Sequence, residues 1–264
     1  MSILRTASLL PVLLTLALAP PMALASGGEA HSPAIAGKGN TTNDSYNHAK
    51  RMLERQVYFD HRVTIYCDAP FDEKKHIELP EGFTTPKHEN RAARVEWEHA
   101  VPAENFGRAF LEWREGDAMC VSPKGQAFRG RRCAELANMD FRYMQADMYN
   151  LFPSVGAVNA VRSNKQYAEL PSAHASFGSC PAKVMAGRFE PPASAKGQVA
   201  RAALYMDDAY PRFHLSEQQR RLFTAWDRVY KVDQWECTRA KRIEALQGNE
   251  NLFVKNPCRE AGLW

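Results

Sequence analysis

Glu98 and His99 are adjacent, near the end of an extended run that stops at Pro102, and Asp147 and Asn150 follow in a later polar segment. A carboxylate and an amide carbonyl are hard oxygen ligands suited to Mg²⁺ or Ca²⁺. A neutral imidazole can take a proton from water near pH 7. Residues of these types, if they meet in space, could hydrolyse phosphodiester bonds.

The segment 94–101 alternates like a strand, so neighbouring side chains should point to opposite faces. Glu98 and His99 would then diverge. Both can reach one phosphate only if the strand twists, bulges or ends there. Pro102 has no backbone N–H for a sheet and gives a reason for the strand to end.

The segment from 138 to 151 carries apolar residues at helical spacing, and Pro153 prevents much continuation. Asn150 would lie near the end of this helix, with Asp147 one turn earlier. We therefore expect a metal ligand at Asn150 and a supporting carboxylate at Asp147. The alternative interpretation is an ordinary solvated helix face.

Two loops carry groups that could hold phosphate oxygens. One follows the predicted helix and contains Asn159, Arg162, Asn164 and Lys165. The other, over 114–132, is rich in glycine and basic residues. Taken alone, such a loop is also typical of an ordinary solvated surface.

The first 25 residues carry one charge, an apolar run over 9–18 and then Ala23-Leu24-Ala25, which is the pattern of a signal peptide and its small-residue cleavage site. Prolines interrupt the apolar run, which disfavours a membrane anchor. We expect an exported protein with a flexible leader over 26–44 and one folded domain over 45–264.

Removal of the signal peptide would lower Lys+Arg from 34 to 33 against 30 Asp+Glu, so the formal charge moves from +4 to +3. A mildly basic balance indicates a polyanionic partner only weakly, because binding depends more on where charges cluster than on their sum.

All six cysteines lie in the mature part, and an even count in an exported chain predicts three disulfides. Short loop closure favours Cys120 with Cys133 and Cys237 with Cys258, which leaves Cys67 with Cys180; other pairings stay open. The chain has no Cys-x-x-Cys spacing, which argues against a cysteine zinc site.

Capping signals predict a helix that begins after Asp44 or Ser45, and further helices that begin near Ser216 and Asp233. A β-branched run over 62–67 predicts a strand. Gly197 to Tyr210 should be helical, and Gly248 should end the helix that follows Asp233. We therefore predict a predominantly helical α+β fold with a small sheet, held together by disulfides.

Several longer pieces occur in a fixed order from about residue 45 to the C-terminus and resemble the endonuclease I family of bacterial periplasmic and secreted nucleases. They are Glu-Trp-Glu-His-x-Val-Pro-Ala-x-x-Phe-Gly, Asp-Met-Tyr-Asn-Leu-x-Pro-x-x-Gly-x-Val-Asn, Arg-Ser-Asn, Glu-Pro-Pro and Trp-Glu-Cys. The resemblance implies a central ββα-metal element, in which a strand supplies the histidine and a following helix supplies the asparagine.

The same resemblance implies that Glu98 and Asn150 bind a divalent cation, usually Mg²⁺ with Ca²⁺ or Mn²⁺ as alternatives, and that His99 is the general base. Gly130-Arg131, ahead of Cys133, best matches the family's phosphate-binding arginine. DNA and RNA are the implied substrates, with little sequence preference. We expect a monomer without stable membrane association. An exported, non-catalytic nucleic-acid-binding module is the alternative function.

Overall fold

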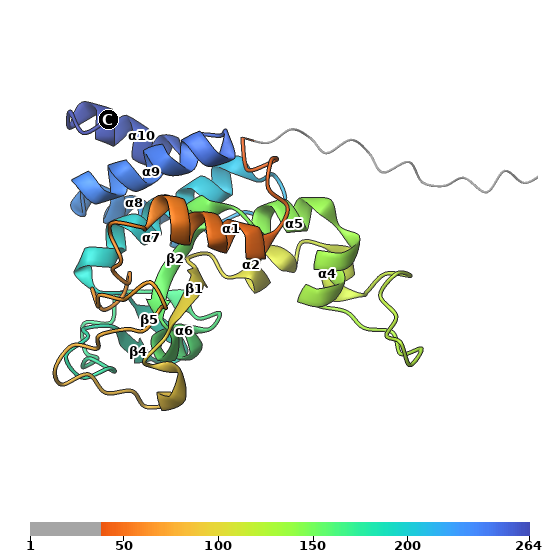
Figure 1. Ribbon diagram of the computed structural model, residues 1–264, viewed down its shortest axis with the longest axis horizontal. Helices are drawn as coiled ribbons and strands as arrows, with labels where there is room; N and C mark the ends of the chain where they lie inside the picture. Colours follow the sequence, from red (N-terminus) through yellow and green to blue (C-terminus); the bar gives the residue numbers. More distant parts are fainter. Residues whose placement is uncertain (1–37) are drawn as a thin grey trace, which may run out of the picture. The chain divides into compact units, whose positions relative to one another are not determined.

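The computed structural model describes residues 38–264, and the signal peptide expected over 1–25 lies outside them. Helices predominate in this part (Figure 1). The α-helices are α1 (Tyr46–Met52), α2 (Ala103–Gly107), α3 (Leu111–Arg114), α4 (Arg131–Ala137), α5 (Met139–Gln145), α6 (Gly156–Arg162), α7 (Ala193–Ala209), α8 (Glu217–Val229), α9 (Gln234–Gln247) and α10 (Leu252–Glu260). Shorter helical segments are η1 (Leu53–Val57, π-helical) and the 3₁₀ turns η2 (Glu89–Arg91) and η3 (Met148–Asn150).

Two small sheets complete the α+β fold that the sequence predicted. In one, β1 (Val95–His99) pairs antiparallel with β2 (Leu151–Val155), so that His99 faces Leu151 across the pair. In the other, the strand order is β3 (Gln166–Tyr167), β5 (Arg188–Glu190) and β4 (Lys183–Met185). Helix α6 begins directly after β2, so β1, β2 and α6 form a strand–strand–helix unit (Figure 1).

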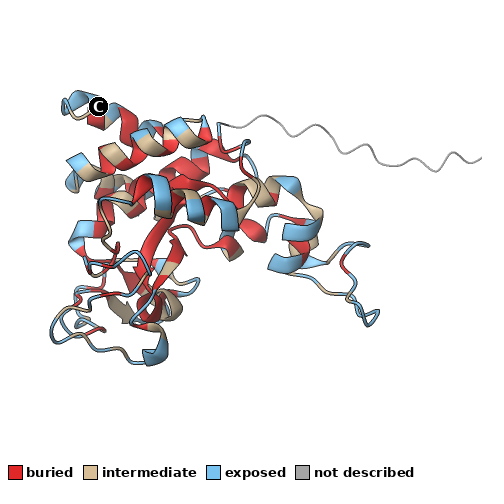
Figure 2. Ribbon diagram, in the orientation of Figure 1, coloured by how far each residue is buried: buried red, intermediate tan, exposed pale blue. Residues whose placement is uncertain are grey.

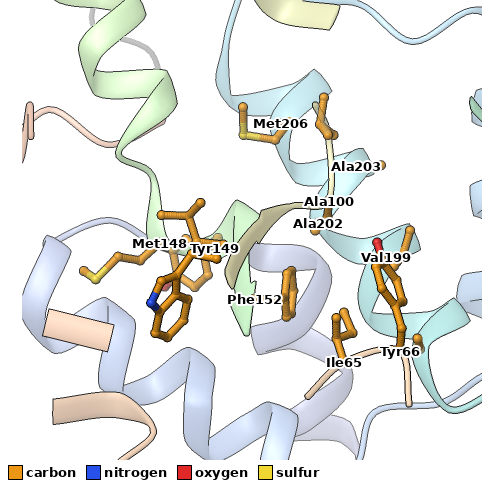
Figure 3. Close-up of a cluster of buried hydrophobic side chains, with 14 of the residues drawn as sticks. Ile65, Tyr66, Ala100, Met148, Tyr149, Phe152, Val199, Ala202, Ala203 and Met206 are labelled. Atoms are coloured by element: carbon orange, nitrogen blue, oxygen red, sulfur yellow. The ribbon is translucent and has the colours of Figure 1, made fainter. Parts of the chain in front are cut away.

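Helix α7 provides much of the buried packing behind this unit. Almost all of α7 is buried, as are β2 and most of β1 (Figure 2). Figure 3 shows Phe152 of β2 in one apolar cluster with Ile65 and with the α7 residues Val199 and Ala202. Side chains of α7 and β2 therefore share one buried core beneath the strand pair.

Local capping signals predicted the helix ends well. Ser45, Ser216 and Asp233 each accept a hydrogen bond from a backbone N–H in the first turn of α1, α8 and α9, respectively. Gly248 has φ = 82° and ends α9, because glycine adopts this left-handed conformation without steric cost. The predicted helix over 197–210 corresponds to α7.

Three local predictions were wrong. The flexible leader over 26–44 does not extend to 44: Asn40 is buried and donates its amide to Tyr143 O, so the folded part includes residues before 45. The expected strand over 62–67 forms only the isolated bridge between Val63 and Pro70.

The third, the predicted helix over 138–151, divides into three elements. Helix α5 ends at Gln145, and Asp147 then adopts an extended conformation and caps the 3₁₀ turn η3 by accepting a hydrogen bond from Tyr149 N. Strand β2 follows at Leu151. Pro153 lies inside β2, and its carbonyl oxygen accepts a hydrogen bond from Ile65 N. Apolar residues at helical spacing therefore continue past the end of α5 into β2, which is why the pattern predicted one long helix.

The cysteines form the three disulfides favoured by loop closure, Cys67–Cys180, Cys120–Cys133 and Cys237–Cys258. The second closes the basic loop next to α4. No helix of residues 38–264 has the length and apolar character needed to cross a bilayer.

Candidate active site

A cavity of about 740 Å³ opens beside the end of β1. Its lining combines acidic, imidazole and amide groups with basic side chains, and we call Lys50, Arg51, Lys75 and Arg131 the basic wall. The polar lining includes Glu96, Glu98 and His99 from β1, Asn159, Arg162 and Asn164 from α6 and the loop after it, and Lys50, Arg51, Lys75 and Arg131. Strand β1 ends at His99, two residues before the end of the run predicted over 94–101, and Glu98 and His99 both line the cavity there.

His99 is held through one ring nitrogen, and within residues 38–264 the other has no hydrogen-bond partner. Its Nε2 lies 2.9 Å from the carbonyl oxygen of Gln145, which can only accept, so Nε2 carries the proton and Nδ1 keeps its lone pair. Tyr46 stacks on the ring with centroids 5.0 Å apart. Burial and the charge of Arg131 lower the pKa of His99 to about 3. The imidazole is therefore neutral near pH 7.

Glu98 offers one carboxylate oxygen to a ligand. Its Oε1 accepts from the Tyr66 hydroxyl at 3.0 Å and pairs with Arg162 Nη1 at 2.8 Å. In the described part of the chain, Oε2 has no hydrogen-bond partner. Burial raises the pKa of Glu98 to about 7 in spite of the neighbouring Arg162. A cation at Oε2 would favour the ionised form.

Asn150 does not line this cavity, so its predicted role as a metal ligand does not fit the geometry. The residue is fully buried, and both ends of its amide bond the backbone of Val101: Oδ1 accepts from Val101 N at 2.7 Å, and Nδ2 donates to Val101 O at 3.0 Å. The amide thus ties the end of β1 to the start of β2.

Asn159, which the sequence pattern placed in a phosphate-binding loop and not at the cation, provides the amide of this cavity. It lies on α6 and lines the cavity together with Glu98 and His99. Its Nδ2 donates to Glu96 Oε2 at 3.0 Å, and its Oδ1 has no hydrogen-bond partner within residues 38–264. A histidine from a strand and an asparagine from the following helix are the arrangement that the family resemblance implied.

Asp147 accepts several hydrogen bonds that connect parts of the fold, and it does not support a metal ligand. Its buried carboxylate accepts hydrogen bonds from the hydroxyls of Tyr205 at 2.6 Å and Tyr210 at 2.5 Å. It also accepts from Gln247 Nε2 at 3.0 Å. These bonds join α7, α9 and the turn before β2, because a buried carboxylate needs several donors.

The three residues predicted to bind substrate have different positions. Arg162 is 1% exposed and donates to His99 O at 2.8 Å and to Ala100 O at 2.5 Å in addition to its pair with Glu98, so it holds the end of β1 and leaves little capacity for phosphate. Asn164 lines the cavity and donates to Glu104. Lys165 lines a separate, neighbouring cavity of about 280 Å³.

Arg131 stands at the start of α4 on the basic wall. Its Nε donates to Gln145 Oε1 at 2.7 Å, and its guanidinium lies 5.1 Å from the centre of the Tyr46 ring. Gln145 therefore contacts both Arg131, through its side chain, and His99, through its carbonyl. This geometry keeps Arg131 as a candidate ligand for a substrate phosphate.

The rest of the basic wall was missed by sequence reasoning. Lys50 and Arg51 are in the last turn of α1, and Lys75 follows in the next loop, where it pairs with Glu54 at 3.2 Å. Burial, followed by the charges of Lys75 and nearby arginines, lowers the pKa of Lys50. The adjacent pair Lys50-Arg51 was the available sequence signal, but nothing in the local pattern places it near Glu98.

The strand–strand–helix unit, with its histidine, carboxylate and amide on one cavity, has the arrangement expected of a ββα-metal nuclease centre. The chain matches the Endonuclease I family over residues 40–258 and belongs to that family.

Curated relatives agree with this membership. A periplasmic deoxyribonuclease of Aeromonas hydrophila is 40% identical over 77% of this chain and 83% of its own length. An extracellular deoxyribonuclease of the same species is 37% identical over 81% of this chain and 91% of its own. Endonuclease-1 of Buchnera aphidicola is 35% identical over 82% of this chain and 83% of its own.

Proposed function

We propose that this Endonuclease I family nuclease hydrolyses phosphodiester bonds of DNA and RNA with little sequence preference and requires a divalent cation, normally Mg²⁺. The observation that carries the proposal is that His99, Glu98 and Asn159 line one cavity together with the residues of the basic wall. The names of the deoxyribonuclease relatives support DNA as a substrate. Three disulfides and the predicted signal peptide support action outside the cytoplasm.

The oxygens of Glu98 and Asn159 fit a hard cation. Glu98 Oε2 and Asn159 Oδ1 would hold it, and Mg²⁺ is commonly bound by one or two protein groups plus water and substrate phosphate. When bound, the cation neutralises charge that develops on the phosphate during the reaction. Among the described residues, no group of three or more His, Cys, Asp or Glu side chains forms an alternative metal site.

His99 would act as the general base. Its unprotonated Nδ1 accepts a proton from the attacking water as the water oxygen bonds to phosphorus and the bond to the leaving sugar oxygen breaks. The Gln145 carbonyl keeps Nε2 protonated and the ring in orientation, and Tyr46 holds the ring by stacking. Arg131 would donate to a nonbridging phosphate oxygen.

Lack of sequence preference is expected from the chemistry of the cavity. Lysine and arginine side chains recognise phosphate groups, which are the same at every step of a nucleic acid and carry no direct base information. RNA presents the same phosphodiester group, so the cavity supplies no charge-based reason to reject it.

Removal of the cation tests the proposal directly. The oxidised mature protein should nick supercoiled plasmid in Mg²⁺, lose this activity in excess EDTA and regain it when Mg²⁺ is restored. Cleavage of an RNA transcript under the same conditions should follow the same pattern. Nicking that persists in EDTA would contradict cation dependence. Plasmid binding without any nicking would favour the non-catalytic alternative.

The basic wall gives a separate prediction. Lys50→Gln and Arg51→Gln should each lower kcat/KM by a similar factor on plasmids of different sequence, because the lost contact is to phosphate. Each should also reduce the slope of log(kcat/KM) against log salt by about 1. Lys38→Gln removes the same charge outside the cavity and serves as the control. An unchanged salt slope in both cavity variants would remove this wall from the substrate path.

A further inference from the structure

We propose that Glu96 is a positioning residue that turns the Asn159 amide so that its oxygen, and not its nitrogen, faces the cation. This inference rests on the proposed function, because it concerns the same site. The observation behind it is the hydrogen bond from Asn159 Nδ2 to Glu96 Oε2, at 3.0 Å. Both residues line the cavity that contains Glu98.

An asparagine side chain has an oxygen and an NH₂ group of nearly equal size, and only the hydrogen-bond partners decide which end points where. An ionised carboxylate can only accept hydrogen bonds. Glu96 must therefore meet Nδ2, which turns Oδ1 to the other side of the amide. A cation needs the oxygen, so the wrong orientation would place two N–H donors where a ligand is required.

Arginine contacts fix Glu96 and occupy it. Arg91 makes a two-pronged contact: its Nε donates to Oε1 at 2.8 Å, and its Nη2 donates to Oε2. Arg94 Nη2 lies 3.4 Å from Oε1. Such bidentate pairing specifies the geometry of a carboxylate as well as stabilising it. Because its charge is already paired, Glu96 suits the role of an orienting acceptor better than that of a cation ligand.

Gly156 allows α6 to reach this carboxylate. A Cβ atom at position 156 would lie 2.5 Å from Arg91 O, closer than real Cβ atoms approach, and 3.0 Å from Glu96 Oε1, which is tighter than most such contacts. The first residue of α6 thus packs directly against the Arg91–Glu96 pair. Asn159, three residues later, is on the same side of the helix. The close approach of α6 therefore brings the amide within reach of Glu96.

The test is direct Mn²⁺ binding by the oxidised mature protein, measured by calorimetry without substrate. Glu96→Gln should weaken Mn²⁺ binding by about 10- to 100-fold, the range for groups that orient metal ligands. Arg94→Gln removes the 60% exposed partner of Glu96 and should change binding by less than about fivefold. The thermal unfolding midpoint of each variant, measured in EDTA, checks that the fold is retained.

A second background separates orientation from charge. In the Asn159→Asp variant, position 159 presents only oxygens, so no amide needs to be oriented. Adding Glu96→Gln to this variant should leave Mn²⁺ binding equal or tighter, because the glutamine amide can donate to the carboxylate introduced at position 159. An equal loss in the Asn159 and N159D backgrounds would mean that Glu96 acts through its charge and would overturn the inference.

The remaining outcomes are also decisive. Normal Mn²⁺ binding by Glu96→Gln in the Asn159 background would overturn the orienting role and leave the proposed nuclease chemistry intact. Absence of Mn²⁺ binding by the unsubstituted protein, both alone and with plasmid, would overturn the proposed function and this inference together.

Discussion

His99→Ala should lower the rate of plasmid nicking by about 10²- to 10⁴-fold, the usual contribution of a general base. The variant lacks the ring nitrogen that accepts the proton, and the alanine methyl group cannot replace it. The rate should be measured at saturating Mg²⁺ and plasmid, so that the effect is read in kcat.

The same variant should still bind Mn²⁺, because the imidazole is not among the proposed cation ligands. His214→Ala removes an imidazole with a 73% exposed side chain, outside the cavity, and should nick plasmid at the original rate. A His99→Ala protein that keeps its fold and more than about a tenth of the rate would contradict the assigned base.

Substitution of Asn159 and substitution of Asn150 should affect different properties: cation binding in the first case and protein stability in the second. Asn159→Ala removes one of the two proposed protein ligands and should raise the Mg²⁺ concentration for half-maximal nicking by at least about 10- to 100-fold, the range typical even of groups that only support a ligand. Its thermal unfolding midpoint in EDTA should change little, since the side chain is only partly buried.

Asn150→Ala should destabilise the protein and leave the Mg²⁺ dependence of the folded fraction unchanged. The change leaves the buried N–H and C=O of Val101 without their side-chain partner, at about 1–3 kcal/mol for each unsatisfied group. In a domain of this size, each kcal/mol corresponds to about 2–4 °C in unfolding midpoint. If Asn150→Ala shifts the Mg²⁺ dependence and Asn159→Ala does not, the assignment to Asn159 is wrong.

Features encoded by neighbouring residues were predictable. The caps at Ser45, Ser216 and Asp233 each depend on a short side chain and a backbone N–H three residues later, and the structure confirms them. Pro102 predicted that the strand would end nearby, and β1 ends three residues before it. The short disulfide loops followed from closure entropy, since nearby cysteines meet more readily.

The local sequence does not show which of the two asparagines, Asn150 or Asn159, lines the cavity. Asn150 and Asn159 both occur in the longer motif, and the expected helix over 138–151 made Asn150 look accessible. In the structure the chain leaves α5 at Gln145 and enters β2 at Leu151, which turns Asn150 into the core and makes α6 the helix that follows the strands. The period of apolar residues did not reveal this change.

A single sequence also did not show which charged residues would be buried. Arg162 looked like a free phosphate ligand because it follows a polar loop pattern, whereas the fold closes over it and pairs it with Glu98. Asp147 is likewise enclosed by tyrosines that lie far along the chain. Such contacts depend on how α6 and α7 pack, which no short-range pattern specifies.

The most direct measurement is the anomalous diffraction signal of Mn²⁺ in crystals of the oxidised protein. We expect one strong peak in the cavity, at about 2.0–2.2 Å from both Glu98 Oε2 and Asn159 Oδ1, with His99 Nδ1 facing the same space and not bonded to the ion. A peak bound elsewhere, or one that contacts neither of these two oxygens, would contradict this assignment.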